Sequence, residues 1–339
     1  MNTVSISMNG SEAGRLCGAM TAGSLFSALI IDGSEYMQAS WVCAALGFLI
    51  ALPILLTAES NSYKNIRRSR LVFTLISLYM AYKAAAIVRL LINSVSYSNL
   101  EIIPTWLIAL IMVSACFYII TKNGAGIGNG IKVGALTAII MIIMIVVGSL
   151  KYMNWRWLTP IGGAGVVMNV KGTITAAGNI SAAGLIFIAA DSRGKNIRRS
   201  VKGAAWGTAA AILLCAYSGM IAPLQFTDIS DRLVNIERFL SNGRTSLGVQ
   251  LPITILWFLG YVMALSSYSF ASAAFLQKVC PDMSGKTVAF ICMAAVYVIA
   301  GIGLAESNVL RTVNNFVYVG TVLITAALCI GRSKNEAAF

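Results

Sequence analysis

The sequence predicts an all-α integral membrane protein with ten transmembrane helices. Apolar residues make up 58% of the 339 residues, and charged residues make up only 11%. Soluble domains carry about a quarter of charged residues, so a chain this poor in charge cannot cover a surface that faces water. The mean hydropathy of +0.80 likewise indicates a chain that is solvated largely by lipid.

Ten apolar segments are long enough to cross the hydrocarbon core, which takes about 20 residues of helix. They are residues 12–31, 38–58, 69–92, 102–121, 131–149, 174–190, 203–223, 249–277, 287–304 and 309–331. The polar opening stretch has no basic region, so we expect no cleavable signal peptide there. We therefore treat residues 1–339 as a single transmembrane domain.

The basic residues predict the orientation. The net charge is +13, from 25 Lys and Arg against 12 Asp and Glu. With the N-terminus inside, sixteen of the 25 fall in inside segments, seven in outside segments and two within the third apolar segment. Lys and Arg collect in cytoplasmic loops, so we expect both termini to be cytoplasmic. Topology accounts for the positive charge, and no nucleic-acid partner is expected.

The ten segments divide into two repeats, about 12–149 and about 174–331. Transporters built from inverted repeats bind their substrates at Gly-interrupted helices near the midplane. The first segment of each half fits this pattern, with small and polar residues in Gly18–Ser24 and in Ala176–Gly184. We therefore expect helices one and six to be broken, because freed backbone groups are tolerated where they line a cavity. The alternative is close packing of two intact helices through small residues.

Polar stripes mark the third and eighth segments. Tyr79, Tyr82 and Lys83 share one face of a helix with 3.6 residues per turn, as do Tyr261 and Tyr268. Lys83 lies near the midplane, where burying an ammonium costs a few kcal/mol or more, so it should face a cavity or a partner. It is expected to be neutral, to bond carbonyls and tyrosine hydroxyls, or to replace the coupling cation of a sodium-driven carrier. The alternatives are a snorkelling lysine and, for the eighth segment, simple helix packing.

The remaining features point away from an enzyme. The chain has no His, which removes the commonest general base and metal ligand. Its seven Cys lack a CxxC pattern, so neither a cofactor nor a metal site is expected. Residues 122–130 form a Gly-rich loop in this interpretation, and residues 228–244 form an amphipathic helix on the outer surface.

Several stretches resemble those of one family. They are Arg89 followed by Ile103-Pro104-Thr105-Trp106, Lys122-Asn-Gly124, Trp157-Leu-Thr-Pro160, Asn169-Val-Lys171-Gly172, and Ile236-Glu-Arg238 with Trp257-Phe-Leu-Gly260. Together they are similar to the B subunit, or spore germination permease, of spore germinant receptors in the amino acid–polyamine–organocation superfamily. Two positions depart from the family pattern, namely Trp106 and the turn that begins at Asp191.

The resemblance implies a LeuT-type fold of 5+5 inverted repeats and a sensor rather than an enzyme. Such a subunit binds a small germinant, commonly an amino acid, in a transporter-like core. It works with a second membrane subunit and a lipoprotein subunit in the bacterial cytoplasmic membrane, here the inner spore membrane. The alternative is a secondary active amino-acid transporter.

The small-residue stretches and the polar stripes together give the candidate ligand site. Half-helix N–H groups would bind a carboxylate, and freed carbonyls would bind an ammonium. The candidate residues are Thr21, Gly23, Ser24, Tyr79, Tyr82, Lys83, Gly178, Asn179, Ser181, Tyr261 and Tyr268.

Overall fold

The fold is all-helical in the part of the chain that is described. A computed structural model describes residues 8–31, 39–58, 70–97, 104–121, 123–150, 153–158, 165–190, 199–221 and 247–302, together with 312–313 and 316. No β-strand occurs among these residues. The helices follow the apolar segments of the sequence in order.

The first helix, α1 (Gly10–Phe26), passes directly into a π-helical turn, η1 (Ser27–Ile31). The others are α2 (Ser40–Ala58), α3 (Arg70–Tyr97), α4 (Thr105–Ile120), α5 (Asn123–Ser149), the short 3₁₀ helix η6 (Trp155–Leu158), α6 (Gly165–Gly184), α7 (Ile186–Ala189), α8 (Arg199–Ile221), α10 (Leu247–Val279) and α11 (Gly285–Gly301). Every predicted segment up to 287–304 therefore coincides with a helix. The tenth segment, 309–331, lies almost wholly outside the described residues, and segment 228–244 lies entirely outside them.

Five helical stretches are long and apolar enough to cross a membrane by length and composition. They are Arg70–Ile92, Gly126–Ser149, Gly165–Ala189, Arg199–Met220 and Phe258–Val279, and α2, α4 and α11 supply shorter apolar helices. Large apolar side chains lie on the outer surface, among them Leu49 on α2, Leu75 on α3 and Leu136 on α5. Apolar surface of this extent marks contact with lipid or with another protein. The chain is therefore a membrane protein.

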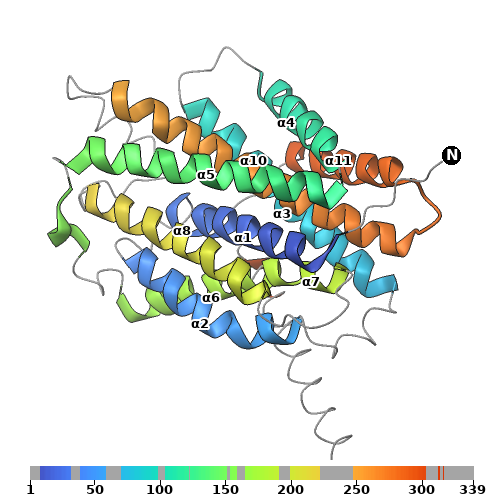
Figure 1. Ribbon diagram of the computed structural model, residues 1–339, viewed down its shortest axis with the longest axis horizontal. Coiled ribbons are helices and arrows are strands. Elements are labelled where there is room, and N and C mark those ends of the chain that lie inside the picture. Colours follow the sequence, from blue (N-terminus) through green and yellow to red (C-terminus); the bar gives the residue numbers. More distant parts are fainter. Residues whose placement is uncertain are drawn as a thin grey trace, which may run out of the picture.

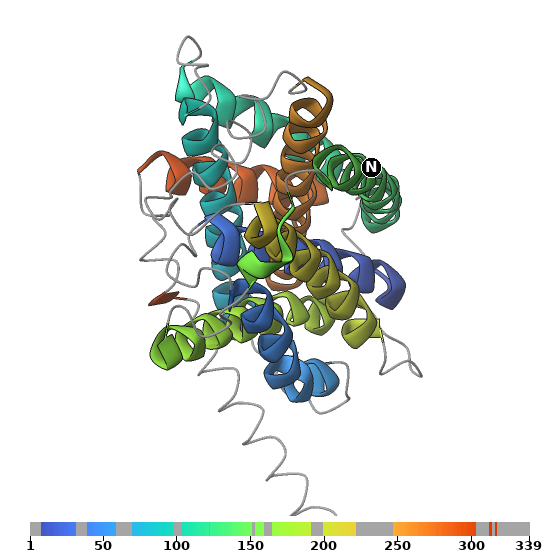
Figure 2. The same ribbon diagram turned by 90° about the vertical axis from the view of Figure 1, so that its left-hand side faces the viewer.

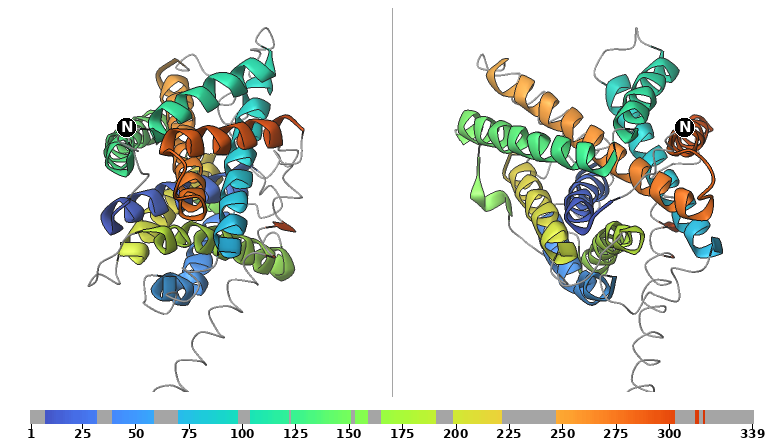
Figure 3. Two further views of the ribbon diagram at one scale, coloured as in Figure 1. Left: turned by 90° about the vertical axis from the view of Figure 1, so that its right-hand side faces the viewer. Right: turned by 45° about the vertical axis from the view of Figure 1, so that its right-hand side comes forward.

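Helices α1 and α6 lie side by side at the centre. The right-hand view of Figure 3 shows both nearly end-on, with α8 and α2 on one side and α10 and α3 on the other. Helix α1 packs on α8 and α10, and α6 packs on α2. Helix α5 runs beside α10 (Figure 1). Helices α4 and α11 pack on α3 and α10, and α4 lies at the opposite end of Figure 2 from α2 and α6.

Glycines allow α1 and α8 to touch along their backbones. A Cβ atom built on Gly203 would lie 2.2 Å from the Gly14 carbonyl oxygen, and one on Gly207 would lie 2.3 Å from the Gly18 carbonyl oxygen. In each helix the two glycines are four residues apart, the GxxxG spacing that permits close helix contact. No other residue fits at these positions without moving a backbone.

Helix one is not broken at the place that the sequence predicts. Helix α1 continues without interruption through Gly18–Ser24, so the predicted break there is wrong. The glycines serve packing instead: a Cβ on Gly18 would lie 2.1 Å from the Trp206 ring, and one on Gly23 would lie 2.2 Å from the Ala264 Cβ. The departure from α geometry comes later, at η1.

Helix six is interrupted, at the end of the stretch that the sequence predicts. Between α6 and α7 the Leu185 N–H donates to the Ala182 carbonyl at 3.2 Å, and the Ile188 N–H donates to the Leu185 carbonyl at 3.0 Å. This three-residue spacing is that of a 3₁₀ turn, which within a longer helix often marks a hinge. Gly178 and Asn179 themselves lie in the uninterrupted part of α6.

Candidate ligand site in the helix core

Lys83 and Asn179 form a buried polar contact between α3 and α6. Lys83 is 3% exposed and Asn179 is 1% exposed, so the lysine does not snorkel to the membrane interface. The Lys83 Nζ donates a hydrogen bond to Asn179 Oδ1. The Asn179 Nδ2 donates to the Thr175 carbonyl at 2.8 Å, which orients the amide so that its oxygen faces the ammonium.

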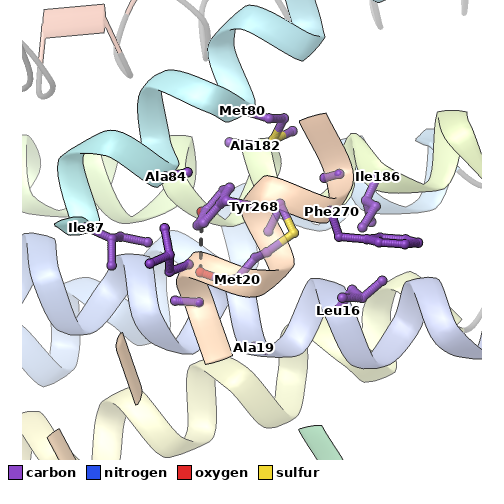
Figure 4. Close-up of a cluster of buried hydrophobic side chains, with 14 of the residues drawn as sticks. Leu16, Ala19, Met20, Met80, Ala84, Ile87, Ala182, Ile186, Tyr268 and Phe270 are labelled. Carbon is purple, nitrogen blue, oxygen red and sulfur yellow. Dashed lines mark hydrogen bonds between the residues drawn. The ribbon is translucent and has the colours of Figure 1, made fainter. Parts of the chain in front are cut away.

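Tyr268 of α10 joins this contact to α1. Its ring centroid lies 5.8 Å from the Lys83 Nζ, within the range of a cation–π interaction. Its hydroxyl donates to the Met20 carbonyl at 3.4 Å (Figure 4). The Ser24 Oγ donates to the same carbonyl at 2.7 Å. Four central helices thus meet at one group of side chains, Ser24, Lys83, Asn179 and Tyr268, which we name the central polar cluster.

Apolar side chains enclose Tyr268. Met80, Ala84 and Ile87 of α3 lie around its ring, and Ala182 of α6 lies next to Met80 (Figure 4). All are buried. In such a surrounding a hydrogen bond is electrostatically stronger than in water, and an unpaired polar group is correspondingly costly.

The other predicted tyrosines lie near the central polar cluster. Tyr79 is buried on α3 about one helical turn before Lys83, and Tyr82, directly before Lys83, is half-buried. Tyr261 lies two helical turns before Tyr268 on α10 and meets the Phe26 ring edge-on, with the ring centroids 6.3 Å apart. The polar stripes on the third and eighth segments therefore face the helix core.

Three predicted residues face other surroundings. A Cβ on Gly207 would lie 2.9 Å from the Thr21 Cβ, so Thr21 faces α8. Gly23 packs on α10, as described above. Ser181 is two residues from Asn179 and thus about 200° away around α6. The Thr21 and Ser181 hydroxyls are buried and have no hydrogen-bond partner within the described ranges. Gly178 is buried beside Asn179.

Two groups that hold the cluster in place were not among the predicted residues. They are the carbonyl oxygens of Met20 and Thr175, which accept bonds from Tyr268 and Asn179. A backbone acceptor exists at every position of the chain, so residue type carries no signal for it. Only the helix register shows which carbonyl is used.

Replacing Tyr268 by phenylalanine should cost about 1 kcal/mol of stability. The change removes the hydroxyl that donates to Met20, and a typical hydrogen bond contributes about 0.5–1.5 kcal/mol net. The aromatic ring and its contact with Lys83 remain. Thermal unfolding of the purified protein measures this effect. A loss of stability of more than about 3 kcal/mol would show that the hydroxyl makes further hydrogen bonds besides the one to the Met20 carbonyl.

The comparison with protein families gives a match in the middle of the chain. Residues 69–230 match the family model described as spore germination protein. The resemblance to the spore germination permeases is confirmed. The match covers just under half of the 339 residues and includes Lys83 and Asn179. No curated protein sequence matches the chain significantly.

Solved transporter structures share the fold. One is MHP1, a nucleobase-cation-symport-1 family transporter in a closed conformation with bromovinylhydantoin bound. The alignment has a TM-score of 0.60 and 13% identity and covers 94% of this chain and 76% of that chain.

Another is the Eremococcus coleocola manganese transporter in complex with an aromatic bis-isothiourea substituted compound. Here the TM-score is 0.54 and the identity 13%, over 97% of this chain and 81% of that chain. At this identity the likeness shows the fold, which is that of LeuT-type transporters. The chain is a transporter-like membrane protein, and the matched family model and the fold point to a permease rather than an enzyme.

Proposed function

We propose that this chain is the germinant-sensing membrane subunit of a spore germination receptor, located in the inner spore membrane. Its ligand is a small molecule, an amino acid, bound at the central polar cluster. The observation that carries the proposal is the meeting of α1, α3, α6 and α10 at buried polar side chains. Lys83 and Asn179 of this cluster lie within the residues that match the spore germination family.

The chemistry of the cluster suits an amino acid. The Asn179 amide oxygen and the Tyr268 ring are acceptors for an ammonium group, and the Lys83 ammonium attracts a carboxylate. The interruption of helix six begins six residues after Asn179, and η1 begins seven residues after Met20. These two irregular turns are suitable hinges, because binding produces a signal only where it favours one conformation over another.

We further propose that the fold is a 5+5 inverted repeat completed by a tenth helix at 309–331, with both termini cytoplasmic. The packing is consistent with exchanging α1 for α6, α2 for α8, α3 for α10 and α4 for α11. The α1–α8 contact then corresponds to α6–α2, the α3–α11 contact to α10–α4, and the α3–α4 contact to α10–α11. Glycines permit both of the central contacts. Gly203 and Gly207 of α8 lie against α1, and a Cβ on Gly47 of α2 would lie 2.5 Å from the Ala176 Cβ of α6.

The contact between α3 and α10 supports the same symmetry. The Ser77 Oγ donates to the Ser272 carbonyl at 2.8 Å, and the Ser272 Oγ donates to the Ser77 carbonyl at 2.9 Å. A local two-fold axis between two helices produces such reciprocal bonds. Under this arrangement the amphipathic segment 228–244 lies on the outer membrane surface.

Gly178→Leu should abolish the germinant response and leave the protein in the membrane. Gly178 is buried directly before Asn179, so a leucine side chain there displaces helix six from its neighbours around the cluster. The release of spore contents after addition of an amino-acid mixture measures the response, and immunoblotting of spore membranes measures abundance. The matched control is Gly130→Leu, because a Cβ on Gly130 meets no atom within 4 Å. A normal response of the Gly178→Leu spores would refute the proposed site.

Active transport of an amino acid is the second candidate function, favoured by the transporter neighbours. Uptake of a labelled amino acid against its gradient by this chain alone in vesicles supports transport. Dependence of the response on a second membrane subunit and a lipoprotein, together with absence of uptake, supports sensing. Co-purification from spore membranes tests the two proposed partners directly.

A further inference from the structure

The Lys83 side chain spans the distance between α3 and α6, whose backbones are not in close contact. In the described residues α3 packs mainly on α10, and α6 packs mainly on α2 and α1. Lys83 nevertheless reaches Asn179 from α3. The hydrogen bond between these two helices is therefore made by a long flexible side chain that spans the distance between their backbones.

The groups that receive the ammonium are held in place by their own bonds. The Asn179 amide is fixed by its bond to the Thr175 carbonyl, and Tyr268 is fixed by its bond to the Met20 carbonyl. Neither bond involves Lys83. An amide oxygen and an aromatic face are both acceptors for an organic ammonium group. The two acceptors therefore keep their arrangement when the lysine is withdrawn.

We propose that Asn179 and Tyr268 form an ammonium subsite, which Lys83 occupies as a tethered internal ligand and for which a free alkylammonium group competes. The inference rests on the proposed sensor function and specifies the amine as the group that the site recognises. A competing amine displaces Lys83 from Asn179 and removes this hydrogen bond between α3 and α6. Binding and the release of a helix contact are then a single event.

The tether also sets the sensitivity of the site. A group held on a short linker competes at an effective concentration in the millimolar range or above. A free amine must therefore bind far more weakly to the native chain than to a variant without the lysine. This difference makes the subsite measurable.

The test uses Lys83→Ala in the full-length protein, purified in detergent. The change removes Cγ, Cδ, Cε and Nζ, and n-propylammonium restores these four atoms. We expect n-propylammonium chloride to raise the Tm of Lys83→Ala saturably, by about 4 °C at a hundredfold excess over its dissociation constant. The Tm of the native chain, and that of the exposed-lysine control Lys278→Ala, should change by less than about 1 °C at the same concentration.

Double variants that also change Asn179 distinguish an ammonium subsite from a simple cavity. Lys83→Ala with Asn179→Asp should bind the amine at least tenfold more tightly, because a carboxylate pairs with the charge, and Lys83→Ala with Asn179→Ala should lose the effect. Equal stabilisation by neutral 1-propanol would overturn the proposal. Accumulation of Lys83→Ala only when n-propylammonium is present during expression also supports the proposal. Equal accumulation with n-propylammonium and with 1-propanol, or no accumulation with either compound, overturns it.

The amine measurement needs no spores, so it is independent of the sensor assay. A Lys83→Ala protein that binds the amine, together with a native receptor that gives no germinant response, retains the subsite and overturns the sensor function. A native receptor that responds to amino acids, together with a Lys83→Ala protein that ignores the amine, retains the sensor function and overturns the subsite.

Discussion

Gly207→Ala should destabilise the protein by about 3 kcal/mol, a large effect for one added methyl group. The new Cβ would lie 2.3 Å from the Gly18 carbonyl oxygen and 2.9 Å from the Thr21 Cβ. Overpacking a core costs about 1–3 kcal/mol, and the upper end applies because the opposing atom is backbone and cannot rotate away. Reversible unfolding of the purified protein in mixed detergent micelles measures the change.

The matched control for this prediction is Gly130→Ala on α5. A Cβ on Gly130 meets no atom within 4 Å, and the residue is exposed. Alanine is favoured over glycine within a helix by about 0.8–1.0 kcal/mol, so this variant should be slightly more stable than the native chain. Equal destabilisation by both substitutions would show that glycine is needed for reasons other than the α1–α8 contact.

Asn179→Ala should cost about 3 kcal/mol, and Lys83→Met should cost clearly less. The alanine leaves the Lys83 ammonium buried without its amide oxygen, and removing one partner from a buried charged group leaves the charge uncompensated. Methionine keeps most of the length of lysine and removes the charge. The double variant should therefore be little less stable than Lys83→Met alone.

A double-mutant cycle of unfolding free energies tests this coupling, which we expect to reach about 2 kcal/mol. The conservative variant Asn179→Gln serves as a control for the volume of the side chain. If Asn179→Ala costs the same in the Lys83→Met background as in the native chain, the two side chains act independently. The interaction in the central polar cluster would then contribute nothing to stability.

The positions of the helices could be predicted from the sequence because the thickness of the hydrocarbon core fixes the length of the apolar segments. The residues at which the helices begin and end were less predictable. Helix α5 begins at Asn123, within residues that the composition indicates as a Gly-rich loop. A Cβ on Gly128 would lie 3.3 Å from the Arg15 Nη1, so this part of α5 packs against the start of α1. Tertiary packing here outweighs the low helix propensity of glycine.

The candidate site could be predicted in part. Helical periodicity brings Tyr79, Lys83 and Tyr268 to the inside, because a stripe of polar residues in an apolar helix must avoid lipid. The partner of Lys83 could not be predicted, because pairing between helices depends on their relative height and rotation. The same limit applies to the glycines: the sequence analysis singles out Gly18–Ser24 as a break, whereas Gly14 and Gly18 together form the contact with α8.

The glycine contact between α1 and α8 affects how a saturation-mutagenesis scan of this chain must be interpreted. Positions 203 and 207 have no room for a side chain. Almost every substitution there should therefore reduce the germinant response as strongly as a substitution at Lys83 or Asn179. Intolerance to substitution therefore reports assembly of the helices and recognition of the ligand alike. The two separate only when membrane abundance and response are recorded for each variant: glycine-contact variants lose both, and ligand-site variants that keep their stability, such as Lys83→Met, lose the response alone.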